Sequence, residues 1–366
     1  MSTPTRFDWD LRRSTASVYV LTQLAQERGM PVAACLAGTG VKPSAVIDPR
    51  TEITARQELA VVRNLLARFG DEPGLGVAAG GRMHVSLYGN WGLALLSSAT
   101  LRDALRTALD YLELAFAVGP MRLYEADGQA RLRLDDTDIP EDVRPFFTER
   151  TMAAVQVLGR ELFGLGVPAD WVSFRHPTPS DLTRHREIFG VDPLFEAQAT
   201  EAAFNAGFLD LPLPQADEWV RGTYERLCQD MLLRRRLARR PSRGDMTNTV
   251  REVLMRDPRQ MSVQATVAAE LYISSRTMSR RLQDEGTCFR ALLEEVRETV
   301  AEQLLHHTDL TTGQISHRLG YAEPAAFIRA FRRWKGCPPQ QYRVLVNSTP
   351  PPSARTTRAT VAPPAA

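Results

Sequence analysis

Hydrophobic residues recur every three or four positions through much of the first 220 residues, and this spacing predicts amphipathic helices. Ser14 precedes one such stretch, which runs to about Gly29. Thr54 and Gln57 have the spacing of a capping box at the start of a second helix. A third helix is predicted after Thr100, on the evidence of Leu101, Leu105, Leu109 and Leu112.

The hydrophobic spacing changes to alternation between residues 121 and 134, which predicts a β-hairpin. Met121 to Tyr124 and Ala130 to Leu134 alternate around Asp127-Gly128, a pair that supplies the positive φ angles of a tight turn. Further helices are predicted over 141–163 and 180–189, with a short strand over 171–174. Mixed elements of this kind predict an α+β domain for residues 1–220.

A single long helix is predicted from Gln215 to about Arg240, after Pro212 and Pro214 interrupt the pattern. Because its end carries runs of arginine, residues 221–242 are interpreted as a basic helical linker. Such a linker either contacts phosphates or is a solvated helix end that complements the helix dipole. Residues 347–366 are rich in Pro, Thr and Ala, and we expect them to be a disordered tail.

The apolar periodicity of residues 243–346 predicts an all-α domain that contains two helix-turn-helix units. In the first unit, Ser262 is expected to cap one helix, Tyr272 and Ile273 to form the turn, and Ser274 to cap a second helix that ends at Gly286. The inner face of that second helix carries Met278 and Leu282. Its outward or flanking positions carry side chains that can contact base edges in a major groove, namely Arg276, Thr277, Ser279, Arg280 and Gln283.

A similar arrangement recurs about fifty residues later. Thr311 and Gln314 form a predicted capping box, Gly320 to Glu323 the turn, and Pro324 begins the next helix. Its expected buried stripe is Phe327, Ala330, Phe331 and Trp334. The candidate DNA contacts are Ala325, Arg329, Arg332 and Arg333. A helix marked by leucine and valine between the units is expected to hold the two DNA-contacting helices about one turn of DNA, roughly 34 Å, apart.

Charge is distributed unevenly along the chain, although the net charge is only +2. Residues 1–220 hold 21 Lys and Arg against 29 Asp and Glu, whereas residues 221–346 hold 22 against 14. Clustered arginine favours a polyanion because binding releases counterions from phosphates. This asymmetry therefore supports double-stranded DNA as the partner of the C-terminal domain, against the alternative that the basic helix faces are merely solvated.

Other functional classes lack their sequence signatures. No apolar run approaches the roughly 18 residues of a membrane span and no signal peptide is evident, so we expect a cytoplasmic protein without a membrane partner. The four cysteines are widely scattered and are expected to be free thiols. Gly74, Gly76 and Gly80 miss the dinucleotide-binding spacing by one residue, and His306-His307 lack a third ligand. We expect no catalytic site, metal or cofactor.

The C-terminal region resembles the DNA-binding domain of the AraC/XylS family of transcription regulators. The resemblance extends over some eighty residues and is carried by Ala269, Leu271, Ser274, Arg276, Arg280, Leu282 and Gly286, then Ile315, Leu319-Gly320-Tyr321, Glu323-Pro324, Phe327, Arg329, Phe331, Trp334, Gly336, Pro339 and Tyr342-Arg343. It implies that each monomer contacts two adjacent major-groove segments of a promoter operator. RNA polymerase and a second copy of the chain, in a homodimer, are further expected partners.

One departure from the family pattern concerns the second helix-turn-helix unit. Ala325 and Ala326 stand where members of the family often carry Ser and His or other polar residues. With only methyl groups there, this unit is expected to contact thymine methyls, to respond to DNA shape, and to anchor through arginine–phosphate contacts.

The first 220 residues resemble the helix-rich effector domain of the ornithine- and arginine-regulator branch of that family. The matching residues are Leu75-Gly76, Gly89 to Leu93, Leu101, Ala104-Leu105, Val172, Phe174, Pro177 and Phe189-Gly190. The resemblance implies a small-molecule effector of unstated identity. Candidate lining residues, chosen by chemistry and with core packing as the favoured alternative, are His84, Tyr88, Trp91 and Tyr111. A regulator that works without a ligand, through dimerisation or protein contacts, is the other hypothesis.

Overall fold

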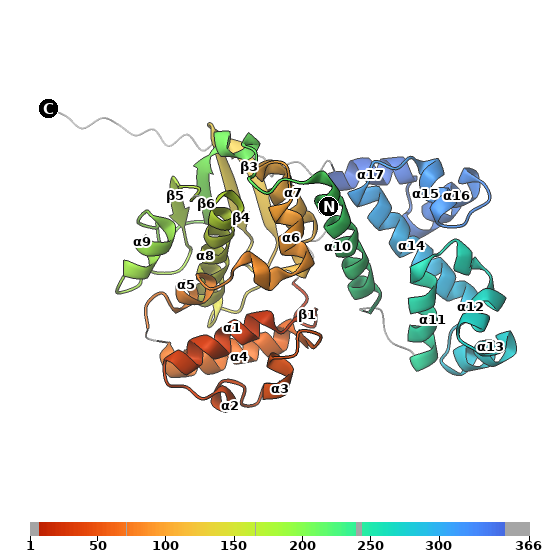
Figure 1. The fold of residues 1–366 in the computed structure, drawn as a ribbon, viewed down its shortest axis with the longest axis horizontal. Helices are drawn as coiled ribbons and strands as arrows, with labels where there is room; N and C mark the ends of the chain where they lie inside the picture. The colour runs from red at the N-terminus through yellow and green to blue at the C-terminus, as the bar shows by residue number, and fades with distance from the viewer. Residues whose placement is uncertain (1–6, 71, 165, 239–243, 348–366) are drawn as a thin grey trace. The chain divides into compact units, whose positions relative to one another are not determined.

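The structure is a computed structural model that describes residues 7–70, 72–164, 166–238 and 244–347 (Figure 1). The chain divides into two compact units, residues 1–240 and residues 241–366. The first unit combines helices with two antiparallel sheets, and the second is helical throughout its described residues. The predicted fold class, an α+β domain followed by an all-α helix-turn-helix domain, is confirmed.

The first unit begins with a helical layer, which lies at one end of the unit (Figure 1). It contains α1 (Ala16–Glu27), α2 (Val32–Cys35), α3 (Pro43–Val46) and α4 (Ala55–Phe69), and strands β1 (Arg12–Ser14) and β2 (Glu52–Thr54) pair antiparallel beside them. The predicted capping box is present, because Thr54 accepts from the backbone of Gln57 while the Gln57 side chain accepts from the backbone of Thr54. Buried leucines and valines of α1 and α4 form the core between them.

A four-stranded antiparallel sheet forms the middle of the first unit, with the strand order β3–β4–β6–β5. Its strands are β3 (Met121–Ala126), β4 (Gln129–Leu134), β5 (Trp171–Ser173) and β6 (Thr200–Asn205). The predicted hairpin joins β3 to β4, and its turn residues Asp127 and Gly128 have φ angles of 54° and 75°. Leu132 lies opposite Leu123 on one side and Ala202 on the other, so the buried face of the sheet is apolar.

Helices surround this sheet, and the long helix α8 (Arg144–Phe163) runs across it (Figure 1). The predicted helix over 141–163 therefore starts three residues later than expected, and the one over 180–189 becomes α9 (Thr183–Phe189). The helix after Thr100 is α7 (Leu101–Asp110), and Thr100 caps it. The remaining helical elements are α5 (Leu75–Gly80), η1 (Val85–Tyr88), α6 (Asn90–Leu96), η2 (Leu112–Leu114) and η3 (Ala206–Asp210).

Helix α10 (Glu218–Ala238) covers most of the predicted linker but belongs to the first unit. Cys228 and Leu232 are fully buried in the same core cluster as residues of α6. Arg235 is also buried, and its guanidinium donates to the backbone oxygen of Glu113 at 2.7 Å. Arg235 is therefore neither a phosphate contact nor a solvated helix end, while Arg239 and Arg240 lie outside the described residues.

The second unit consists of α11 (Asp245–Arg256), η4 (Gln260–Ser262), α12 (Gln264–Glu270), α13 (Ser275–Asp284), α14 (Phe289–His307), α15 (Thr312–Arg318), α16 (Pro324–Lys335) and α17 (Pro339–Asn347). The predicted tail lies outside the described residues from 348 onward. All four cysteines are free thiols. Among the described residues, no helix is long and apolar enough to cross a membrane.

Candidate functional site

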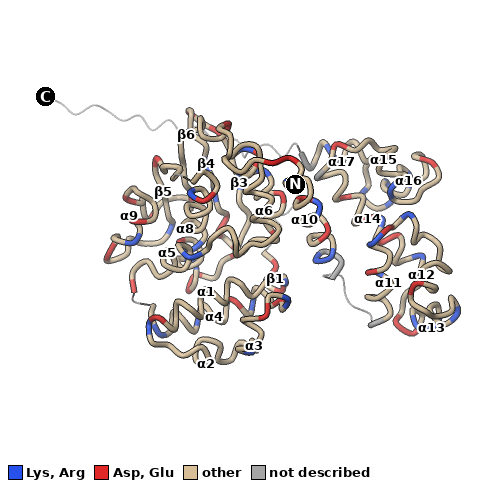
Figure 2. The backbone as a smooth tube through the Cα atoms, in the orientation of Figure 1, with Lys and Arg blue, Asp and Glu red and all other residues tan. Residues whose placement is uncertain are grey.

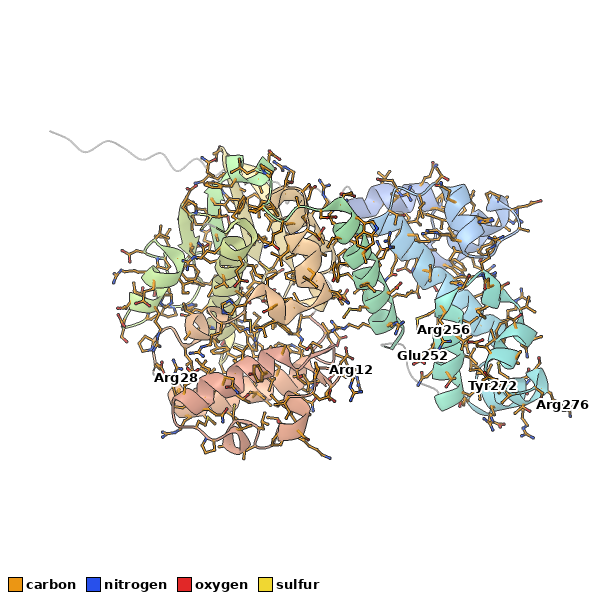
Figure 3. The ribbon with its side chains drawn as sticks, viewed as in Figure 1. Arg12, Arg28, Glu252, Arg256, Tyr272 and Arg276 are labelled. Atoms are coloured by element: carbon orange, nitrogen blue, oxygen red, sulfur yellow. The ribbon has the colours of Figure 1, made fainter. Side chains whose placement is uncertain are left out.

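The first candidate site begins with the turn between α12 and α13. Ser274 caps α13 by accepting a hydrogen bond from the backbone N–H of Thr277 at 3.1 Å, as predicted. Tyr272 in the turn has a φ of 55° and is 96% exposed, and Figure 3 shows it at the surface of the second unit. The predicted cap at Ser262 is wrong, because Val263 precedes α12 and the Ser262 hydroxyl donates to the backbone oxygen of Arg259.

Helix α13 buries one face and exposes the other. Met278 and Leu282 are fully buried. Arg276, Arg280 and Gln283 are exposed at positions i, i+4 and i+7, so they share the outer face. Among the described residues, no ion pair or side-chain hydrogen bond engages the two arginines, and Figure 3 shows Arg276 projecting away from the helix. Their guanidinium groups are therefore free to contact an external acceptor.

The two hydroxyl residues predicted on this helix have local partners. The Thr277 hydroxyl lies 2.8 Å from that of Ser274 at the helix start. The Ser279 hydroxyl accepts from the side-chain amide of Gln264 at 2.6 Å, which ties α13 to α12. Both side chains are half-buried. Their hydrogen bonds lie within the motif, whereas Arg276, Arg280 and Gln283 are exposed on its outer face.

The second motif repeats this arrangement with α15 and α16. The predicted capping box of Thr311 and Gln314 is present. Pro324 begins α16, and the buried face of this helix carries Phe327, Ala330 and Phe331. Ala325, Arg329 and Arg332 are exposed at positions i, i+4 and i+7. This spacing matches that of Arg276, Arg280 and Gln283 on α13.

Arg333 differs from these three residues because it faces α14. Its guanidinium forms an ion pair with Glu294 at 3.1 Å, although the side chain is 61% exposed. Arg290, Arg329 and Arg333 line a surface pocket of about 340 Å³ between α14 and α16, together with Glu294. Figure 2 shows the basic residues that α13, α14 and α16 carry. The pocket is therefore basic overall, with one carboxylate inside it.

Charged side chains fix α16 against α14. Lys335 at the end of α16 forms ion pairs with Glu298, at 3.0 Å, and with Glu302. Burial alone would lower the pKa of Lys335, but the hydrogen bonds with these carboxylates raise it above its usual value. Arg297 donates to the backbone oxygens of Leu319 and Gly320 at 2.7 and 3.1 Å. These contacts fix both ends of the second motif on one helix.

Sequence reasoning missed three arginines of this unit. Arg281 is exposed at the end of α13, next to the predicted Arg280. Arg290 lies in the first turn of α14 and lines the surface pocket. Arg297 lies 4.5 Å from the centre of the Tyr321 ring and supports the turn before α16. The basic charge of residues 221–346 signalled such residues, but no periodic pattern distinguished which of them face outward.

The first unit contains a cavity of about 120 Å³ between the sheet, α6, α7 and α8. Tyr88 and Trp91 line this cavity, whereas His84 and Tyr111 do not. The His84 ring nitrogen instead pairs with Glu161 at 2.5 Å on the surface, and Tyr111 is buried in the core beside α10. Two of the four predicted effector residues are thus brought together at one cavity.

A buried ion-pair network adjoins this cavity through Arg150. Glu58 of α4 pairs with Arg150 of α8 at 2.6 Å and with Arg13 of β1 at 3.0 Å. Burial alone would raise the pKa of Glu58, but the two guanidinium groups lower it. Arg150 also donates to the backbone oxygen of Phe116 at 2.7 Å. The network joins α4, α8 and β1, and Arg150 is part of the cavity wall.

Comparison with known proteins identifies the family of both units. Residues 29–213 match the model of the arabinose-binding N-terminal domain of AraC transcription regulators, and residues 267–344 match a helix-turn-helix domain. A transcriptional regulator of the helix-turn-helix type from Mycobacterium tuberculosis is 37% identical over 338 residues, which cover 91% of this chain and 96% of that protein. The chain belongs to the AraC family of transcriptional regulators.

Two further regulators are similar to this chain over most of its length. The ornithine utilization regulator of Pseudomonas aeruginosa is 29% identical over 323 residues, which cover 88% of this chain and 94% of that protein. The crystal structure of the transcriptional regulator CdpR from Pseudomonas aeruginosa covers 90% of this chain and 98% of its own, with 23% identity and a TM-score of 0.45. The two family models and the relatives from Mycobacterium tuberculosis and Pseudomonas aeruginosa that match in sequence show that the chain is a transcriptional regulator with a helix-turn-helix DNA-binding domain and an N-terminal domain of the arabinose-binding type.

Proposed function

We propose that this regulator reads a specific DNA sequence with the outer faces of α13 and α16, and that a small molecule bound in the first unit controls this binding. One observation carries the DNA-binding part. The second helices of both motifs expose three side chains at the same i, i+4, i+7 spacing, namely 276, 280 and 283 on α13 and 325, 329 and 332 on α16. Matched outer faces suit two successive major-groove segments.

The two helices have different roles in this proposal. Arg276 and Arg280 are unpaired and exposed, and an arginine can donate two hydrogen bonds to one guanine. The α16 face begins with the methyl group of Ala325, so its arginines serve mainly as phosphate contacts. Base contacts carry sequence preference, whereas phosphate contacts contribute affinity that falls steeply with salt.

Alanine variants measured on a selected duplex and on scrambled DNA test this division. Arg276→Ala and Arg280→Ala are each expected to weaken specific binding by about 1–3 kcal/mol and to relax base preference locally. Arg332→Ala should weaken binding to both duplexes and reduce the slope of log affinity against log salt by about one. Arg333→Ala is expected to act in the same direction, but it also breaks the ion pair with Glu294.

The matched control is Arg256→Ala. This arginine lies on α11, is exposed, and pairs with Glu270 at 3.1 Å, so its loss removes the same charge away from both outer faces (Figure 3). It should leave base preference unchanged. Equal losses on specific and scrambled DNA for Arg276→Ala, Arg280→Ala and Arg332→Ala would contradict the proposed roles.

The cavity of the first unit supports control by an effector. Ligands that bind the folded state alone raise stability, by about 2.7 kcal/mol at a hundred times the dissociation constant. Thermal-shift screening of the full chain, followed by DNA-binding assays with each hit, is therefore the test. A ligand that raises the melting temperature and changes DNA affinity supports the proposal. The alternative, control by dimerisation or protein contacts alone, predicts that no such ligand is found.

A further inference from the structure

We propose that the cavity of the first unit binds an uncharged, largely apolar molecule of about benzene size, which accepts a hydrogen bond from Nε1 of Trp91. This inference rests on the proposed function in one respect, because it names the chemical class of the effector. The cavity volume of about 120 Å³ is close to the roughly 150 Å³ at which an apolar cavity takes up benzene.

The walls of the cavity are almost entirely apolar. The sheet contributes Leu132 and Phe204, α6 contributes Leu95, and α7 and α8 contribute Leu105 and Leu158. Apolar walls favour an apolar ligand, because transfer of its surface from water to the cavity is favourable. A sugar or an amino acid requires several hydrogen-bonding or charged partners that these walls do not supply.

Most polar side chains at the cavity already have partners within the protein. Arg150 is committed to Glu58 and to the backbone of Phe116. The Thr151 hydroxyl donates to the backbone oxygen of Phe147 at 2.7 Å. The side-chain amide of Gln156 donates to the backbone oxygen of Val167 at 3.0 Å. A carboxylate or ammonium group in the cavity would therefore lack a free counter-charge, which excludes charged ligands on energetic grounds.

Trp91 provides the exception. Its side chain is 4% exposed and lines the cavity, and its Nε1–H is buried without a hydrogen-bond partner in the described structure. Among the described residues, the hydroxyl of the neighbouring Tyr88 has one hydrogen-bond partner, the Sδ atom of Met83 at 3.8 Å, and sulfur is a weak acceptor. A buried donor without an acceptor costs free energy, so a ligand that brings one acceptor gains that energy on binding. This geometry points to a single nitrile, carbonyl or ether group.

The position of Trp91 also connects the cavity to the end of the first unit. Trp91 lies on α6 and belongs to the same buried cluster as Cys228 and Leu232 of α10. The side chain of Asn90, next to Trp91, lies 3.4 Å from the Sδ atom of Met231 on α10. Helix α10 is the last described element before the second unit. A ligand that orders Trp91 therefore acts on the helix that precedes the DNA-binding unit.

Benzonitrile and phenylacetylene test the inference on the full chain, because they have the same shape and only the nitrile is a good acceptor. The chain has five tryptophans, and Trp91→Phe assigns the Trp91 indole N–H signal in ¹⁵N-tryptophan spectra. Benzonitrile should shift this signal downfield in a saturable manner. In Trp91→Phe, benzonitrile should bind about threefold to tenfold more weakly, while phenylacetylene changes by less than about twofold. Trp171→Phe, outside the cavity wall, is the matched control and should change neither.

Benzoate, L-ornithine and L-arabinose complete the set of probes and are expected not to move the Trp91 signal. The inference is overturned if no probe perturbs that signal, if one of the three polar probes does so as strongly as benzonitrile, or if Trp91→Phe weakens both aromatic probes equally. The same samples are titrated with a selected duplex. If the chain binds the selected duplex but no aromatic probe, the cavity inference alone is contradicted. If the chain prefers no duplex over scrambled DNA, the proposed function is contradicted.

Discussion

Single side chains decide where the DNA-binding helices begin, and only some of them can be recognised from sequence. Ser274 and Thr311 are predicted as caps and act as caps. Each precedes an uninterrupted helix, and its side chain accepts a hydrogen bond from the backbone N–H three positions later. Ser262 has the same chemistry but ends the short helix η4, so its hydroxyl bonds backward to Arg259. A local preference for capping is satisfied in either direction, and the tertiary position of η4 selects between them.

The candidate effector-binding residues, too, could be placed only in part from the sequence. Tyr88 and Trp91 line the cavity, whereas His84 is at the surface and Tyr111 packs toward α10. Aromatic and histidine side chains look equally suitable in a sequence. Which of them face a cavity depends on how η1, α6 and η2 pack against the sheet, and that packing is not encoded locally.

The half-buried carboxyl group of Asp110 is expected to make the stability of the first unit depend on pH. Burial raises its pKa to about 6, Arg106 opposes this effect, and Glu225 adds to it. Between an unfolded value near 3.8 and about 6, the folded state retains a proton that the unfolded state releases, so stability falls as pH rises through this window. Asp110→Asn should therefore raise the free energy of unfolding at pH 7 by about 1–2 kcal/mol.

Urea unfolding followed by tryptophan fluorescence checks this prediction, because four of the five tryptophans lie in the first unit. The gain from Asp110→Asn should be much smaller at pH 4 and should disappear below about pH 3, where the aspartate is protonated in both states. A gain of the same size at pH 4 and pH 7 would mean that the carboxylate is not the cause.

At the scale of elements, long and regular helices were predictable and short ones were not. The helices α4, α7, α8 and α14 carry several turns of apolar periodicity, which is a strong signal. The short helices α5 and α6 contain glycines, which lower the expected helix propensity. Strand β6 was also missed, because its middle residues Glu201, Ala202 and Ala203 lack the β-branched or aromatic side chains that indicate a strand.

The glycines that resembled a failed nucleotide-binding motif have a packing role. A Cβ atom at Gly80 would lie 2.2 Å from the backbone oxygen of Arg150, and one at Gly76 would lie 2.4 Å from that of Phe146. Both glycines lie on α5, which packs directly on α8. The spacing of four residues therefore marks a close helix–helix contact rather than a phosphate loop.

Gly80→Ala tests the close contact of α5 with α8. The added methyl group meets backbone, which cannot move aside as a flexible side chain can, so we expect a loss of about 1–3 kcal/mol in the free energy of unfolding. Gly222→Ala is the matched control, since its Cβ would have only the Arg226 side chain nearby, at 4.0 Å on α10. That change should stabilise the helix by about 0.5–1 kcal/mol. Similar effects of both substitutions in thermal or urea unfolding would contradict the packing argument.

At the scale of the whole molecule, the sequence predicted two domains of different charge, residues 1–220 and 243–346, joined by a basic helical linker over 221–242. The chain divides at Arg240, twenty residues beyond the expected end of the first domain. The reason lies in α10, whose arginines suggested a linker although Cys228, Leu232 and Arg235 are buried in the first unit. A basic helix end and a buried helix can share one sequence, because Arg226 and Arg234 are exposed whereas Cys228 and Leu232 are buried.

Helix α10 also exposes apolar side chains that suit a second copy of the chain. Trp219 is 78% exposed, and Leu227 and Met231 are exposed further along the helix. Exposed apolar residues at helical spacing favour a helix–helix contact between protomers. We expect a homodimer in sedimentation equilibrium, and Trp219→Ser with Leu227→Ser should weaken it at least about tenfold. A wild-type chain that stays monomeric at high concentration would exclude this interface.

Selection from fragmented DNA of the source genome tests most directly whether α13 and α16 together read DNA. The purified full chain is incubated with the fragments, and the bound fraction is sequenced beside that of an Arg276→Ala, Arg280→Ala double variant. We predict a shared motif with two conserved segments about 10 base pairs apart, of which the double variant loses one and keeps the other. The account is contradicted if the wild-type chain enriches no motif, or if the double variant enriches the same complete motif.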